Sequence, residues 1–132
     1  MIGLDTNVLL RLFIGKDDPR QSERARSFVA EQSKTGPLSV NVIVLAEFVW
    51  VLAKSLKMPK NDIAKYLDGL LQSDDLEVQR RPVAVAALAA YRKGRADYAD
   101  FLLALVNVDL GCQSTASFDE KALKSELFST VP

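Results

Sequence analysis

The sequence predicts an α/β fold in which a parallel sheet lies between layers of helices. Short apolar runs of strand length alternate with longer runs whose apolar residues recur at helical spacing. The turns between them are short, which is typical of a parallel sheet whose strands are connected by helices. We therefore expect a three-layer α/β/α sandwich with a central parallel sheet of about five short strands.

Five segments have the length and apolar character of strands. MIGLD opens the chain, LSV follows the break at TGP, and LEVQ alternates between apolar and polar residues. CQSTA and FSTV are the last two. The strands are expected at residues 1–5, 38–40, 76–79, 112–116 and 128–131.

Capping and breaking residues mark the ends of the helical segments. Asn41 is a good N-cap, and Pro59 and Pro82 stand at helix starts. Gly15, in the polar GKDDPR turn, and Gly94 follow helix ends. The helices are expected at residues 6–14, 21–34, 41–56, 59–72, 82–94, 98–110 and, as a short helix, 119–127.

Length and composition indicate one soluble domain spanning residues 1–132. The chain is 48% hydrophobic and 26% charged, proportions that are ordinary for a globular protein. Its 17 basic and 17 acidic residues cancel, which argues against a nonspecific polyanion coat. Nucleic acid is not excluded, because affinity for phosphate depends on local clusters of Lys and Arg.

Cysteine, histidine and hydropathy narrow the chemistry and the location. Cys112 is the only cysteine, so an internal disulfide and a thiolate metal cage are excluded, and a reducing cytoplasm is expected. The absence of histidine excludes Ser-His and Cys-His pairs and His-ligated zinc. We expect no signal peptide, because the first expected strand directly follows Met1. The longest apolar run is interrupted by Glu47 and is shorter than a membrane span of about 20 residues.

Four places in the sequence carry acidic side chains that packing alone does not explain. Asp5 ends the first expected strand, and Asp119 follows a later one. Glu47 lies inside an apolar helix, and Asp97 and Asp100 stand three residues apart at the start of another. Ligands of parallel α/β sheets gather beyond the carboxyl ends of the strands. We therefore expect these carboxylates to converge at one edge of the sheet.

Of the five acidic residues at these four places, Glu47 is the one that a purely structural role explains least well. Its neighbours at the i±3 and i±4 positions are Ile43, Val44, Trp50 and Val51, so no cation lies within one helical turn. A carboxylate on such a helix is expected to be desolvated and to require a positive charge nearby.

Convergent carboxylates repel one another in a partly buried site, and a hard divalent cation relieves that repulsion. Mg²⁺ and Mn²⁺ prefer oxygen ligands, which matches an acidic site without histidine or thiolate. One such ion activates a water, and a second, about 3.5–4 Å away, can stabilise the leaving oxygen of a phosphodiester. The expected reaction is phosphodiester hydrolysis that leaves 5′-phosphate and 3′-hydroxyl ends.

Helix capping offers an alternative interpretation for most of these acids. Asp5 can simply cap the helix that follows it, and Asp119 can start the helix of DEKAL. Asp97 and Asp100 have the spacing of a capping box. This alternative fails for Glu47, which lies in the middle of its helix.

Four segments together resemble the PIN-domain family, in particular the VapC-type toxins of bacterial and archaeal toxin–antitoxin pairs: LDTNVLL, LSVNVIVLAEF, DYADFLLALV and STASFDEKAL. Their order and spacing, and the length of the chain, make the combination specific. The resemblance implies a parallel sheet flanked by helices, Mg²⁺- or Mn²⁺-dependent ribonuclease activity on substrates such as tRNA or rRNA, homodimers, and inhibition by a cognate antitoxin.

The same resemblance implies which residues are catalytic and bind the metal. These are Asp5, Glu47, Asp100 and Asp119, with Asp97 as the alternative third acid. Asp100 is preferred because the third acid of the family directly precedes an apolar LLAL-like run.

Small polar residues match positions that support the acids or waters in the family. They are Thr6, Asn7 and Ser117. Ser117 replaces a more usual threonine, and Glu120 stands where a basic residue is common. The first departure affects how Asp119 is positioned. The second adds a negative charge at a place where RNA phosphates are expected to bind.

A small basic patch lies directly before the third acidic position. Arg92, Lys93 and Arg95 can bind phosphates of RNA without a net positive charge on the chain, and Arg11 is a weaker candidate. The alternative for Lys93 is a solvated cation favoured by the C-terminus of its helix.

Three competing functions remain open at this point. The first is a noncatalytic interaction module whose acids are caps and solvated residues. The second is a metal-dependent phosphatase or receiver-type domain, although DTN supplies no second acid two residues after Asp5. The third is a structure-specific DNA nuclease, which usually has extra elements for handling duplexes.

Overall fold

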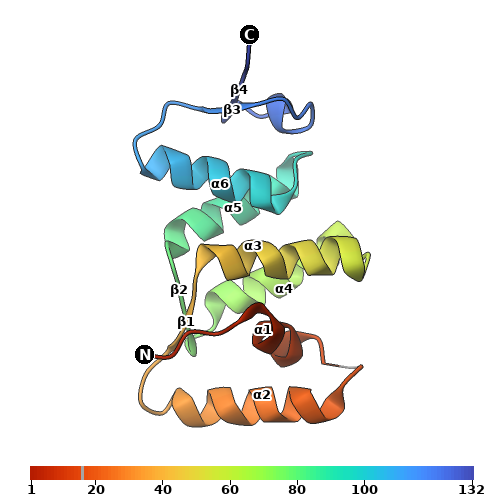
Figure 1. Cartoon of the computed structure of the whole chain (residues 1–132), viewed down its shortest axis with the longest axis vertical. Helices are drawn as coiled ribbons and strands as arrows, with labels where there is room; N and C mark the ends of the chain where they lie inside the picture. Colours follow the sequence, from red (N-terminus) through yellow and green to blue (C-terminus); the bar gives the residue numbers. More distant parts are fainter. Residues whose placement is uncertain (16) are drawn as a thin grey trace.

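The computed structural model describes residues 1–15 and 17–132 and shows an elongated stack of helices (Figure 1). The N-terminus lies beside the first sheet, and the C-terminus lies at the far end of the long axis. Lys16, in the turn expected after the first helix, is outside the described residues. Within the described ranges no helix is long and apolar enough to cross a membrane.

The first two helices pack against each other at one end of the stack. They are α1 (Thr6–Phe13) and α2 (Pro19–Gln32). Pro19 occupies the first turn of α2, and Asp18 Oδ1 caps that helix by accepting a hydrogen bond from the Gln21 amide at 3.1 Å. The helix therefore begins two residues earlier than the apolar pattern predicts.

A small parallel sheet follows, and its two strands alternate buried and more exposed residues as predicted. β1 (Leu38–Val40) pairs with β2 (Leu76–Val78), with Leu38 opposite Leu76 and Val40 opposite Val78. The expected strand at 1–5 joins this sheet only through a parallel bridge between Gly3 and Ser39. Two backbone hydrogen bonds secure the bridge, from Leu4 N to Ser39 O at 2.9 Å and from Ser39 N to Ile2 O at 2.8 Å.

Four helices form the middle of the molecule. They are α3 (Val42–Trp50), α4 (Lys60–Gln72), α5 (Arg81–Lys93) and α6 (Tyr98–Asp109). Asn41 caps α3, as predicted, by accepting a hydrogen bond from the Val44 amide at 2.9 Å. The expected helix 41–56 is continued after Trp50 by a π-helical turn, η1 (Val51–Ser55), in which the hydrogen-bond spacing widens.

The chain ends in a segment that we call the C-terminal segment (residues 115–130). β3 (Thr115–Ser117) and β4 (Phe128–Thr130) pair in parallel, and the 3₁₀ turn η2 (Ala122–Lys124) lies between them. The expected helix 119–127 is reduced to this turn. Ala122 is its one buried residue, and so short a helix gains too little packing to offset its ordering cost.

Two hydrophobic clusters of very different size hold the molecule together. The larger one runs from Leu4 through β1 and β2 to Phe101 and Leu102, with Phe48 and Tyr98 among its largest fully buried side chains. The smaller one contains Ala104 of α6 together with Ala122 and Phe128. The larger cluster orders residues 1–109, which we call the body, apart from the undescribed Lys16.

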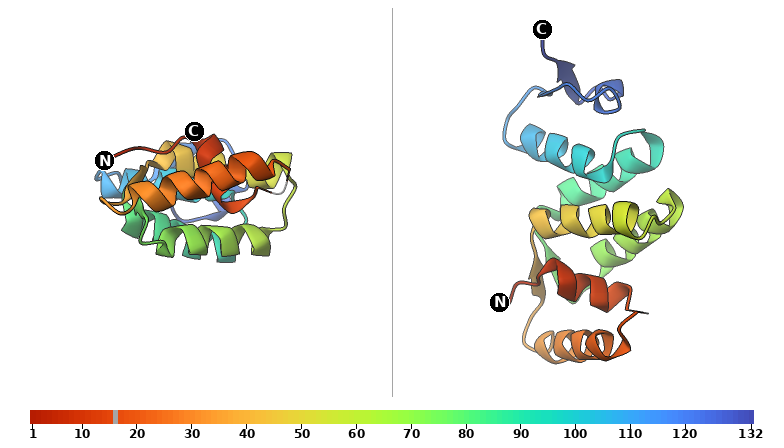
Figure 2. Two further views of the ribbon diagram at one scale, coloured as in Figure 1. Left: turned by 90° about the horizontal axis from the view of Figure 1, so that it is seen from below. Right: turned by 45° about the vertical axis from the view of Figure 1, so that its right-hand side comes forward.

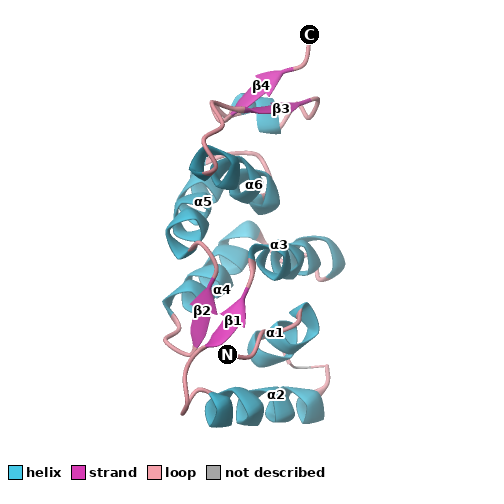
Figure 3. Cartoon of the chain, turned by 60° about the vertical axis from the view of Figure 1, so that its left-hand side comes forward, coloured by secondary structure: helices cyan, strands magenta, loops and turns pink. Residues whose placement is uncertain are grey.

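The expected single sheet of about five strands is not confirmed. In the described residues the strands form two separate two-stranded sheets, and Figure 3 shows α5 and α6 between them. The right-hand view of Figure 2 shows the same separation. Strands buried on both faces carry continuous runs of large apolar side chains. The β3 sequence TAS carries none, and Ala116 is exposed, so little apolar surface drives this strand into the body.

Candidate metal centre

Asp5 lies where the N-terminal segment leaves the sheet and α1 begins. Its backbone is extended, with φ −79° and ψ 157°, and its carbonyl accepts the Leu9 amide hydrogen bond at 3.2 Å. Its side chain is exposed and, within the described part of the chain, makes no capping hydrogen bond. Capping of α1 therefore does not account for this carboxylate, which is free to bind a ligand.

Thr6 and Asn7 follow on the first turn of α1. Thr6 is only 6% exposed, and its Oγ1 has no hydrogen-bond partner among the residues that the structure describes. A buried hydroxyl without a partner costs about 1–3 kcal/mol, so a water or ligand atom beside it would be stabilising. Asn7 is exposed. The buried Thr6 hydroxyl thus belongs to the residue that directly follows Asp5 in the chain.

Glu47 lies on a solvent-exposed face of α3, with Ile43 and Trp50 exposed one turn before and after it. The expectation that this carboxylate is desolvated is therefore wrong for the structure described. The buried residues of α3, such as Leu45 and Phe48, pack into the larger cluster. Glu47 is not among them, so the apolar composition of the helix does not remove water from its carboxylate. Water hydrates the carboxylate, and no nearby cation is required.

Asp97 and Asp100 open α6. Asp97 is the N-cap residue, and its amide donates a hydrogen bond to Asp100 Oδ2 at 3.3 Å. This bond is half of the capping-box pattern that the spacing predicts. Asp97 is exposed, whereas Asp100 is partly buried beside Phe101 and Leu102 of the larger cluster. Capping is therefore one role of this pair, and it leaves the second oxygen of Asp100 available.

Asp119 lies in the loop after β3, where two hydrogen bonds to residues close in sequence fix its orientation. Its amide donates to Ser117 Oγ at 3.0 Å, and its Oδ1 accepts from the Lys121 amide at 2.9 Å. These are the local turns that Ser and Asp side chains favour. The hydroxyl of Ser117 thus holds the backbone of Asp119, and Oδ2 remains free for another partner.

The structure brings Asp100 into electrostatic contact with two other acids. Burial is the main cause that raises the pKa of the Asp100 carboxyl, and the charges of Asp97 and Asp119 raise it further. The Asp97 amide opposes them through its hydrogen bond. Asp100 lies on α6 and Asp119 in the loop after β3, so the fold lets the charge of one acid act on another that is distant in sequence.

The full set of acids does not meet in the structure. In residues 1–15 and 17–132 no three acidic side chains lie close enough together to hold a metal ion. The chemistry of the donors still fits Mg²⁺ or Mn²⁺, because every candidate ligand is an oxygen, and the buried Thr6 hydroxyl lacks a partner at the same edge. A bound ion would require the C-terminal segment and the Asp5 edge to approach each other.

The basic residues predicted from the sequence lie near the start of α6. Arg92 and Lys93 are in the last turn of α5, and Arg95 is in the connection to α6. All three are exposed, and none is in an ion pair with another described residue. The position of Lys93 also fits the alternative of a cation at a helix C-terminus. Arg11 differs, because it forms an ion pair with Asp17 at 2.7 Å.

Gln79 and the arginines of α2 also lie at positions of interest that the sequence patterns did not indicate. The side-chain oxygen of Gln79 accepts a hydrogen bond from the Val42 amide at 3.1 Å. The backbone N–H of Gln79 donates to the Val40 carbonyl at 2.8 Å. Gln79 therefore ties the end of β2 to the start of the helix that carries Glu47. Arg20 and Arg24 line a groove that also includes Asn7. Their i, i+4 spacing on α2 is the signal that indicates a shared face.

Comparison with known proteins identifies the family. The chain is 27% identical over 122 residues to a protein named VapC ribonuclease from Aquifex aeolicus (strain VF5), which covers 92% of this chain and 89% of that protein. No solved structure matches the chain significantly. The family model of the PIN domain matches residues 2–125. This match spans nearly all of the sequence, and the chain therefore belongs to the PIN domain family.

Proposed function

We propose that this chain is a divalent-metal-dependent endoribonuclease and the toxin of a toxin–antitoxin pair. The observation that carries the proposal is the match of the PIN domain model to residues 2–125, because the segments with Asp100 and Asp119 both lie inside it. The charge of Asp119 also acts on Asp100, although the two acids are distant in sequence. The resemblance to the Aquifex aeolicus VapC ribonuclease supports RNA as the substrate.

Asp5, Glu47, Asp100 and Asp119 are the proposed metal ligands, with Asp97 as the alternative to Asp100. Mg²⁺ or Mn²⁺ supplies a Lewis acid that polarises the phosphodiester and favours water as the nucleophile. Burial raises the pKa of the Asp100 carboxyl, and a nearby cation would favour its charged form. Ser117 orients Asp119 through its backbone, and Thr6 offers a buried hydroxyl to a water or ligand atom.

The two free sheet edges suggest how these residues gather. β3 pairs only with β4, and the N-terminal segment pairs only with β1, among the described residues. Both segments run parallel to their partners. Each is paired on one side only, so its other edge carries backbone groups that no neighbouring strand pairs among the described residues. Joining the two edges in a single domain would produce the expected sheet of about five strands and would bring Asp119 towards Asp5.

The proposed partners follow from the same assignment. We propose tRNA or rRNA as the substrate, a cognate antitoxin as the inhibitor, a homodimer as the assembly, and the cytoplasm as the location. The exposed Arg92, Lys93 and Arg95 would bind RNA phosphates near α6, because guanidinium and ammonium groups without carboxylate partners are free to do so.

The test is a cleavage assay with purified full-length protein and a mixed pool of tRNA and rRNA. Cleavage is expected with Mg²⁺ or Mn²⁺, with 5′-phosphate and 3′-hydroxyl ends, and is expected to stop with EDTA or in Asp5→Asn. Cutting that survives both the chelator and the substitution would contradict the proposed mechanism.

A noncatalytic PIN-like interaction module is the second candidate. The separation of the acids among the described residues favours it, because no three of them form a metal site. This candidate requires that Mn²⁺ leaves the melting temperature unchanged and that Glu47→Gln has no effect on function. A metal-dependent increase in melting temperature that Glu47→Gln removes would rule it out.

A further inference from the structure

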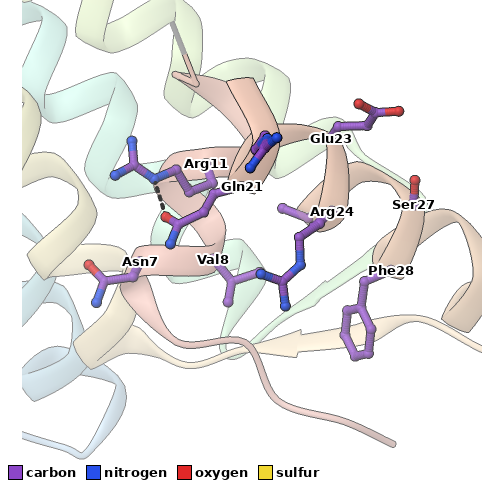
Figure 4. Close-up of a pocket in the computed structure, with 10 residues that line it drawn as sticks. Asn7, Val8, Arg11, Gln21, Glu23, Arg24, Ser27 and Phe28 are labelled. Carbon is purple, nitrogen blue, oxygen red and sulfur yellow. Dashed lines mark hydrogen bonds between the residues drawn. The ribbon is translucent and has the colours of Figure 1, made fainter. Parts of the chain in front are cut away.

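A groove of about 890 Å³ lies between α1 and α2, and none of the proposed metal ligands lines it (Figure 4). Its volume is in the range of about 300–1,000 Å³ that is typical of ligand-binding clefts. It contains basic, aromatic and aliphatic side chains from both helices. The residues that matter for the argument are Asn7, Val8, Arg11, Arg20, Arg24 and Phe28.

The charge of the groove is suited to an anion. Arg20 and Arg24 are exposed, and neither forms an ion pair with any other residue that the structure describes. Glu23 also belongs to the lining, but Figure 4 shows its carboxylate directed away from the Arg24 guanidinium, and the two form no ion pair. Two unneutralised guanidinium groups on one helix face favour binding of successive phosphates.

Arg11 gives the groove a fixed wall. Its Nε donates to Gln21 Oε1 at 2.9 Å, which links α1 to α2, and its NH1 pairs with Asp17. The guanidinium is therefore held in place from two sides. A groove whose wall is already ordered loses less conformational entropy when a ligand binds.

The groove also offers flat apolar surface. Phe28 is 39% exposed, and its ring stands beside the groove on the same side of α2 as Arg24, which reaches towards Val8 (Figure 4). Exposed aromatic rings interspersed with arginines are the arrangement that binds single-stranded nucleic acid, because bases stack on the rings and phosphates pair with the cations.

The position of the groove favours RNA over an acidic peptide. Asn7 is part of the lining and stands two residues after Asp5, so the groove extends to the first turn of α1, which directly follows that proposed metal ligand. A strand cut at that edge must continue past it, whereas an acidic peptide has no such requirement.

We propose that the groove between α1 and α2 holds a single-stranded stretch of the RNA substrate, with Arg20 and Arg24 on its phosphates and Phe28 stacked on a base. This inference rests on the proposed ribonuclease function. It adds a binding surface on α2 to the basic patch at Arg92, Lys93 and Arg95.

Binding is measured separately from cleavage, so that the two proposals can fail independently. Full-length protein in EDTA is titrated into a short fluorescently labelled RNA of randomised, unpaired sequence, and anisotropy is followed at several salt concentrations. The variant Arg20→Gln with Arg24→Gln is compared with Arg26→Gln, which changes an exposed arginine of the same helix outside the groove. Phe28→Leu is tested as a single change.

The double variant is expected to bind about tenfold more weakly, with the slope of log affinity against log salt reduced by about 1.4, because each phosphate contact on a single strand contributes about 0.7. Phe28→Leu is expected to weaken binding at least about fivefold without changing the slope. Arg26→Gln is expected to bind as the unchanged protein does.

Equal losses in Arg26→Gln and the double variant would overturn the proposal, since they would show a general effect of charge. Unchanged RNA binding in the double variant, together with loss of binding to a labelled acidic peptide, would assign the groove to a peptide. Groove-dependent binding of RNA in EDTA, together with no cleavage of the tRNA and rRNA pool in Mg²⁺ or Mn²⁺, would support the groove and count against the proposed ribonuclease function.

Discussion

The body and the C-terminal segment hold their acidic side chains in different ways. Asp5, Glu47 and Asp100 extend from elements anchored in the larger hydrophobic cluster. Asp119 extends from a segment whose buried cluster contains only Ala104, Ala122 and Phe128 among the described residues. Its orientation depends mainly on local hydrogen bonds to Ser117 and Lys121.

This difference shows how a metal ion could act as part of the fold. Side chains on the body are positioned by packing before any ligand binds, whereas Asp119 needs a further interaction to hold its segment in place. An ion shared by the two regions would supply that interaction, and its binding free energy would also stabilise the contact between them.

The largest expected effect is on catalysis. Asp5→Asn is expected to lower the rate of RNA cleavage in Mg²⁺ by at least about a hundredfold, because it removes a proposed ligand while changing little packing. The control is Asp74→Asn, which neutralises an exposed acid before β2. Equal rates for the two variants would show that Asp5 has no special role.

Packing gives the next largest contrast. Phe48 is fully buried and packs edge-on against Phe13 with 6.0 Å between the ring centroids, so Phe48→Ala is expected to lower the free energy of unfolding by about 3–5 kcal/mol. Phe128→Ala is expected to lower it by only about 1–2 kcal/mol, because its cluster is small. Urea denaturation measures both, and a larger loss for Phe128→Ala would reverse the proposed order of the two regions.

The positioning of Asp119 gives a smaller effect. Ser117→Ala removes the acceptor of the Asp119 amide and is expected to reduce the rate of cleavage several-fold, with at most about 1 kcal/mol lost in stability. Ser125→Ala is the matched control, because its hydroxyl accepts the Leu127 amide in the same segment at 3.2 Å. If both variants lose the same activity, Ser117 acts on the segment as a whole.

The smallest expected effect concerns pH. The pKa of the Asp100 carboxyl is raised in the folded protein, so the unfolded chain loses this proton at a lower pH than the folded protein does. The free energy of unfolding therefore falls as pH rises from 3.8 through the raised pKa. Without metal, Asp100→Asn is therefore expected to raise the melting temperature at neutral pH by about 1–2 °C, a small gain because the group is partly solvated. The gain should vanish as pH falls below the ordinary value of 3.8.

The sequence predicts the body better than the C-terminal segment, and the reason is apolar content. LSV and LEV carry large side chains that the sheet buries, and Asn41 is the N-cap that the pattern indicates. CQSTA and DEKALKSEL contain too few large apolar residues for periodicity to indicate where they pack. The expected joining of their strands to the central sheet therefore depends on contacts that the pattern does not contain.

The candidate site shows the same limit. Strand ends and motif spacing indicate Asp5, Asp100 and Asp119 as candidates without a structure, because these features are local. The exposure of Glu47 depends on which side of α3 packs into the larger hydrophobic cluster. The partial burial of Asp100 depends on contacts with distant residues. Neither property can be obtained from the residues next to the acid.

The most direct test of the central claim is a calorimetric titration of Mn²⁺ into the unchanged protein, Asp5→Asn, Asp119→Asn and the double variant. If one ion is bound between the body and the C-terminal segment, each single change removes most of the affinity, and the double change removes little more. No measurable Mn²⁺ binding by the unchanged protein, or losses that simply add, would contradict the account.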